Sequence, residues 1–134
     1  MIAFQIASTG HEVKRRYRLR KSADFERVRH TGKSYAHPLV ILISTPVEDA
    51  TIRIGVSAGR SIGNAVQRNR AKRRIREAIS PLLADLPPGH DLVILARKAM
   101  GNTKTPQVQH ALIALLKRAN LLSRDYEHRP SENR

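Results

Sequence analysis

The sequence predicts one small domain that combines helices with strands, and three observations predict it. The length of 134 residues fits a single domain. Residues 39–43, 52–56 and 91–96 are short apolar segments rich in β-branched side chains, as strands are. Residues 71–82 and 108–119 instead repeat apolar side chains at the spacing of an amphipathic helix.

The N-terminal part begins with a basic segment and a short helix. Residues 1–17 are predicted to form a flexible basic arm, which either is a solvated tail or contacts phosphates. A helix is expected to start at Ser22 as its N-cap, with Asp24 and Glu26 near the positive end of the helix dipole. Gly32 is expected to end this helix.

Three strands are expected in the middle of the chain. Residues 35–45 form one continuous candidate, which Pro46 ends. Residues 51–57 alternate in polarity and are predicted to be an antiparallel hairpin partner of that strand. Residues 91–96 form a third strand after a break at Pro87-Pro88-Gly89.

Two helices carry apolar stripes that would face a core. In the central helix the stripe continues backward through Lys72, Arg68 and Asn64 at four-residue steps, so only its C-terminal half is anchored. The last helix is expected to have Thr105 as its cap and Pro106 at its first helical position, and to run to about Asn120. The domain would therefore span residues 18–122, with a disordered polar tail at 123–134. In the central helix, the residues of the predicted apolar stripe are Ala71, Ile75, Ala78, Ile79 and Leu82.

The most informative stretch is residues 60–76, which holds seven Arg or Lys and no acid. Because an unpaired buried cation is costly, this segment must face water or a polyanion. The net charge of +14 and the isoelectric point near 11.4 favour a polyanionic partner. The amides and the dipole at the start of the helix would add to the attraction for phosphate.

Several function classes are disfavoured by what the sequence lacks. There is no cysteine, which excludes disulfides and thiolate sites and fits a reducing cytoplasm, the expected location. The eleven acids show no metal-ligand spacing, the six histidines are scattered, and no nucleotide-binding glycine loop is present. The sequence therefore indicates a binding protein and not a self-contained catalyst.

Structured RNA is the preferred polyanion. No helix precedes the basic helix at the spacing of a helix-turn-helix motif, which weighs against DNA. A membrane surface would require an apolar face opposite the charges, and the N-terminal half of the helix has none. The longest uncharged apolar run, residues 39–47, is too short to span a bilayer.

Residues 60–77, RSIGNAVQRNRAKRRIRE, resemble the signature of the bacterial ribonuclease P protein subunit around its Arg-Asn-Arg core. Residues 18–25, RLRKSADF, are similar to the opening segment of the same family. The resemblance covers roughly residues 18–120. It implies an α/β (α+β) two-layer sandwich of the ribosomal-protein-S5-domain-2-like type, with a mixed four-stranded sheet, three helices and a left-handed βαβ crossover. The fourth strand is not evident in the sequence.

The resemblance also implies a function, namely assembly with a large catalytic RNA that removes the 5′ leader from precursor tRNA. In this family the RNA holds the catalytic Mg²⁺ ions, so the chain would be an accessory subunit of a phosphodiester hydrolase, with no catalytic or metal-binding residue of its own. The partners would be the catalytic RNA and precursor tRNA. The family implies contacts with the catalytic RNA at Arg60, Asn64, Arg68, Asn69, Arg70, Lys72 and Arg73.

A second implied surface is a cleft along the sheet for the single-stranded leader. Phe25 matches one of its aromatic positions, although a core role fits that residue equally well. Arg29 stands where relatives carry an aromatic residue, so leader contact would depend more on charge than on stacking. Tyr35 is a further candidate. The alternative function is that of a ribosomal-protein-like RNA-binding or assembly module with no linked reaction.

Overall fold

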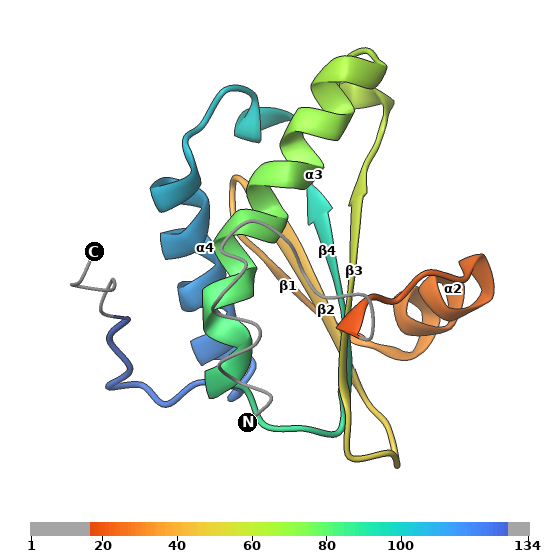
Figure 1. The fold of residues 1–134 in the computed structure, drawn as a ribbon, viewed down its shortest axis with the longest axis vertical. Coiled ribbons are helices and arrows are strands. Elements are labelled where there is room, and N and C mark those ends of the chain that lie inside the picture. The colour runs from red at the N-terminus through yellow and green to blue at the C-terminus, as the bar shows by residue number, and fades with distance from the viewer. Residues whose placement is uncertain (1–16, 129–134) are drawn as a thin grey trace.

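A mixed four-stranded sheet organises the protein (Figure 1). The computed structural model describes residues 17–128, so residues 1–16 of the predicted arm and 129–134 of the predicted tail lie outside the described residues. Tyr17, which was predicted to belong to the arm, is instead buried in the main core. The strands lie in the order β1-β2-β4-β3, and β4 pairs antiparallel with β2 and parallel with β3. They are β1 (Lys33–Ala36), β2 (Val40–Pro46), β3 (Ile52–Ala58) and β4 (His90–Ala96).

The fourth strand is β1, which begins before the segment that was predicted to be one long strand and overlaps it at residues 35–36. Residues 35–45 divide at a tight connection, and β1 and β2 pair antiparallel with Tyr35 opposite Leu42. Proline has no N–H to donate to a ladder, so Pro38 cannot continue a paired strand. The turn is closed by the amide of His37, which donates to the carbonyl of Val40 at 2.9 Å. The prediction of a single strand was therefore wrong.

The hairpin prediction was also wrong, because β3 does not pair with β2. Instead β4 lies between them, and β3 connects to β4 through a helix, α3 (Ala65–Ile79). The two strands run upward in Figure 1 with α3 in front of the sheet, and β4 lies to the left of and behind β3. The crossover is therefore left-handed, the rare form for this connection.

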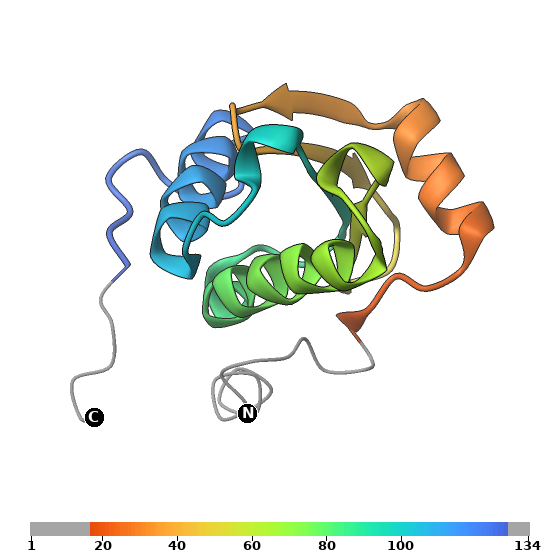
Figure 2. The same ribbon diagram turned by 90° about the horizontal axis from the view of Figure 1, so that it is seen from above.

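Helices cover both faces of the sheet, as Figure 2 shows from above. The helices α3 and α4 (Thr105–Arg118) pack on one face and enclose the main core, while the short α2 (Ser22–Thr31) lies on the other face. The predicted stripe is confirmed, because Ala71, Ile75, Ala78 and Ile79 of α3 are buried, and so is Leu82 in the following 3-10 helix η3 (Ser80–Asp85). None of the helices in residues 17–128 is long and apolar enough to cross a membrane.

The ends of α2 and α4 differ slightly from expectation. Lys21 and not Ser22 is the N-cap residue of α2, while Gly32 ends that helix as predicted, with its amide donating to the carbonyl of Val28 at 2.7 Å. Lys104 precedes α4, so Thr105 is the first helical residue and not the cap.

The segment after α4 packs against the body. Leu121 and Leu122 are buried in the main core. The hydroxyl of Tyr126 donates to a carboxylate oxygen of Asp85 at 2.7 Å. Within the stretch 123–134 that was predicted to be a polar tail, Tyr126 thus has a polar partner and packs against the main core.

Candidate nucleic-acid interface

The first turn of α3 is fixed by reciprocal hydrogen bonds. The side-chain oxygen of Asn64 accepts from the amide of Gln67 at 2.9 Å, and the side-chain oxygen of Gln67 accepts from the amide of Asn64 at 2.8 Å. This capping box satisfies two amides at the helix start. Gly63 precedes it at φ 138°, and a Cβ there would lie 2.0 Å from the Gln67 oxygen, so only glycine fits.

The two halves of α3 differ in how they contact the core. Ala71 and Ile75 begin the buried stripe, whereas the N-terminal half projects beyond the core. Arg68 and Lys72 are half-buried, and the guanidinium of Arg68 donates to the carbonyl of Gly63 at 3.0 Å. The other sequence-predicted contacts are exposed: Arg60, Asn64, Asn69, Arg70 and Arg73.

These cations have no local counter-charge. No carboxylate in the described part of the chain forms an ion pair with Arg60, Arg70, Lys72 or Arg73. The next acid along the sequence, Glu77, accepts a hydrogen bond from the hydroxyl of Thr105 at 3.0 Å. Because no nearby anion offsets the charge of these cations, this end of the molecule has a positive potential.

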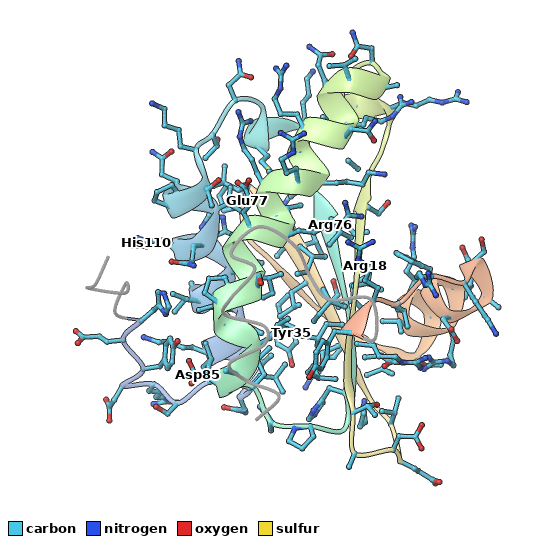
Figure 3. The ribbon with its side chains drawn as sticks, in the orientation of Figure 1. Arg18, Tyr35, Arg76, Glu77, Asp85 and His110 are labelled. Carbon is cyan, nitrogen blue, oxygen red and sulfur yellow. The ribbon has the colours of Figure 1, made fainter. Side chains whose placement is uncertain are left out.

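Farther along α3, the positive charge continues on a second side of the helix. Arg76 is half-buried and lies near Arg18, as Figure 3 shows. Burial, and then the charge of Arg18, lower the pKa of Arg76. Arginine has the highest pKa of the ionisable side chains in proteins, so Arg76 remains charged at neutral pH.

A small hollow lies beside this arginine pair. It has a volume of about 240 Å³ and includes Phe25 in its wall. The Phe25 ring packs over Gly55 of β3 so closely that a Cβ on Gly55 would lie 2.6 Å from the ring. Phe25 is only half-buried, so it both packs on the sheet and contributes to a surface hollow. The remaining wall residues are Arg18, Leu19, Arg20, Ile54, Val56 and Arg76.

The three predicted leader residues do not share one surface. Arg29 is exposed on α2, one helical turn after Phe25. Tyr35 lies on the opposite face of the sheet, where it packs against the main core and the Arg118 guanidinium lies 5.9 Å from its ring centre. The structure therefore separates Tyr35 from Phe25.

One carboxylate that sequence analysis missed holds the α2 face together. Asp91 is fully buried and accepts two hydrogen bonds from Arg53, at 3.1 and 2.9 Å, and one from Arg27 at 2.5 Å. The hydrogen bond to Asp91 raises the pKa of both arginines. The sequence did contain a signal for this role, namely an acid within an apolar strand, because a buried carboxylate requires a cationic partner.

The described residues offer no preformed metal site. No group of three or more His, Asp or Glu lies together among residues 17–128 in a way that could hold an ion. The groups that point outward around α3 are guanidinium, ammonium and amide groups. Such donors suit phosphate oxygens and not divalent cations.

Comparisons with known proteins agree with this arrangement. The model of the Ribonuclease P family matches residues 13–120. The ribonuclease P protein component of Chloroflexus aurantiacus is 41% identical over 111 residues, covering 82% of each chain. That of Listeria innocua is 38% identical over 111 residues, covering 82% of this chain and 93% of the relative.

Solved structures give the same result. The RNase P protein of Staphylococcus aureus superimposes with a TM-score of 0.72 at 32% identity, covering 80% of this chain and 98% of that one. The RNase P protein of Thermotoga maritima gives a TM-score of 0.68 at 30% identity, covering 75% and 96%. The mixed sheet with three helices is thus the fold of these proteins.

Proposed function

The chain belongs to the ribonuclease P protein family, and on this premise we propose that it binds the catalytic RNA of that enzyme and the 5′ leader of precursor tRNA. As a protein component it is a subunit of an endoribonuclease. The proposed reaction is hydrolysis of the phosphodiester bond that joins the leader to the mature tRNA 5′ end.

The catalytic RNA would contact the N-terminal half of α3. Arg60, Arg70 and Arg73 are exposed, and no carboxylate of the described chain neutralises them. Each guanidinium can donate two parallel hydrogen bonds to a phosphate. The capping box orders the first turn of α3, so the backbone that carries Arg70 and Arg73 is already formed before RNA binds. Lys72 and Arg68 would add charge, and Asn64 and Asn69 would add amide groups.

The leader would lie along the hollow beside Phe25. Its wall combines an aromatic ring with three arginines, which suits a single strand whose bases contact apolar surface and whose phosphates contact cations. Arg29 extends the positive charge along α2. Tyr35 is not part of this proposed surface, because it faces α4.

Magnesium would be held by the RNA. When bound there, it would supply a Lewis acid and an activated water for the hydrolysis. The contribution of the chain is electrostatic: its cations offset repulsion where two RNAs meet, which should lower the magnesium concentration that cleavage requires.

The observation that carries the proposal is the row of exposed cations on α3 in a member of this family. The test is precursor-tRNA cleavage at low magnesium by the catalytic RNA, with and without the chain. We expect strong stimulation by the wild-type chain, reduced stimulation by Arg70→Ala and full stimulation by the charge-matched control Arg124→Ala. Absence of stimulation, or cleavage by the chain free of RNA, would contradict the proposal.

A further inference from the structure

An open depression lies at the end of the sheet where β1 and β4 stop. Its volume is about 1040 Å³, and none of its wall residues belongs to the predicted RNA contacts. The wall combines small apolar side chains with cations, a hydroxyl and an imidazole. We call it the strand-end depression; its residues are Ala36, His37, Pro38, Ser61, Ala96, Arg97, Lys98 and Ala99.

Two polar side chains in this wall, those of His37 and Arg97, are held by hydrogen bonds. The imidazole Nδ1 of His37 accepts from the amide of Leu39 at 3.0 Å, which fixes the ring. The guanidinium of Arg97 donates to the carbonyl of His37 at 3.3 Å, and its backbone amide donates to the carbonyl of Leu39 at 3.0 Å. Since a guanidinium has five N–H donors, Arg97 keeps others for a ligand. Lys98 is exposed and has no partner within the described chain.

The chain segments that form this wall carry cations and no carboxylates. The three segments that form the wall lie within residues 27–47, 50–76 and 92–124, and none of these stretches contains Asp or Glu. A concave surface lined by one sign of charge concentrates its potential and attracts counter-charged ligands. The ligand that fits is therefore an anion.

The depression is continuous with the RNA surface of α3. Ser61 belongs to η2 (Arg60–Ile62), the turn that carries Arg60 and contacts η4 (Lys98–Met100). On the other side of η4, the guanidinium of Arg74 donates to the carbonyl of Gly101 at 3.5 Å. An RNA bound to α3 would thus reach the depression without leaving the protein surface.

We propose that the strand-end depression binds one unpaired nucleotide of the catalytic RNA. The base would rest on the small apolar side chains and against the fixed His37 ring, since unpaired bases are commonly recognised by stacking. The phosphate would contact Arg97 and Lys98. An unpaired nucleotide is required because a paired base is covered by its neighbours in an A-form helix. This inference rests on the proposed function.

The test compares Lys98→Ala with Arg70→Ala and the charge-matched control Arg124→Ala, all checked for folding by thermal melts. Dissociation constants for the ribonuclease P RNA are measured against salt. We expect Lys98→Ala to reduce the slope of log K against log salt by about 0.7–0.9, the value for one phosphate contact. Arg124→Ala should leave it unchanged.

Chemical probing of the RNA supplies a second measurement. The wild-type chain should protect one unpaired nucleotide that becomes reactive again with Ala99→Asp, which places a carboxylate in the depression. An unchanged slope for Lys98→Ala beside a reduced slope for Arg70→Ala would overturn this inference and leave the proposed function intact. If Arg70→Ala also had no effect, the proposed function itself would fail.

Discussion

Replacement of Arg70 or Arg68 by alanine should separate phosphate contact from helix stability. Arg70 is exposed and has no partner in the described chain, whereas Arg68 is half-buried and its guanidinium donates to the carbonyl of Gly63. Both variants should lose one phosphate contact. Only Arg68→Ala should also lose a bond that secures the start of α3.

The expected magnitudes follow from the number of cations. If Arg60, Arg68, Arg70, Lys72 and Arg73 each neutralise one phosphate, these five contribute about −4 to the slope of log K against log salt, and each alanine reduces the magnitude of the slope by about 0.8. Between 50 and 200 mM salt, the variant would then lose roughly threefold less affinity than the wild type. Loss of the hydrogen bond in Arg68→Ala should cost about 1 kcal/mol in the free energy of unfolding.

The assay pairs filter binding over a salt series with thermal melts of the free protein. A change of 1 kcal/mol should lower the melting temperature of Arg68→Ala by roughly 4 °C, while Arg70→Ala melts with the wild type. An unchanged slope for Arg70→Ala would refute direct phosphate contact. Equal melting temperatures for the two variants would refute the second role assigned to Arg68.

Three further substitutions test the framework. Ile75→Asp should unfold the domain, since it places a charge at a fully buried position; a cooperative melt near the wild-type temperature would contradict the assignment of the helix face. Asp91→Asn should lower the free energy of unfolding by about 1–3 kcal/mol in urea titrations, because Arg27 and Arg53 lose the buried carboxylate that pairs with both, and an unchanged urea midpoint would contradict this role of Asp91. Gly55→Ala should displace the Phe25 ring and lower the free energy of unfolding by about 1–3 kcal/mol. It should also weaken cross-linking of the leader more than binding of the catalytic RNA. Equal losses in the two measurements would disprove a separate leader surface.

Local patterns predicted the helices well. The stripe from Ala71 to Leu82 fixed which half of α3 is buried, because helical spacing places those residues on one face whatever the strand order. The same reasoning predicted that the cations of the basic helix lie outside the core, because a core cannot accommodate unpaired charges. The Arg-Asn-Arg core identified the family.

Strand pairing was not predictable from local patterns. An apolar strand pairs equally well with any neighbour of suitable pattern, so residues 51–57 gave no indication that β4 would lie between β3 and β2. Pro38 was the missed signal for the division of β1 from β2. Asp91 was missed because its partners, Arg27 and Arg53, lie far from it in sequence.

The division of α3 into a buried half and a projecting half has an evolutionary consequence. Substitutions at exposed positions of the projecting half, such as Asn69 and Arg70, should change what the protein recognises with little effect on whether it folds, while substitutions at the buried Ile75, Ala78 and Ile79 should do the reverse. Lineages can therefore adjust the projecting half to a drifting RNA sequence without first acquiring compensating substitutions elsewhere. An engineer could likewise transplant residues 64–70 between relatives and expect a folded chimera with altered partner preference.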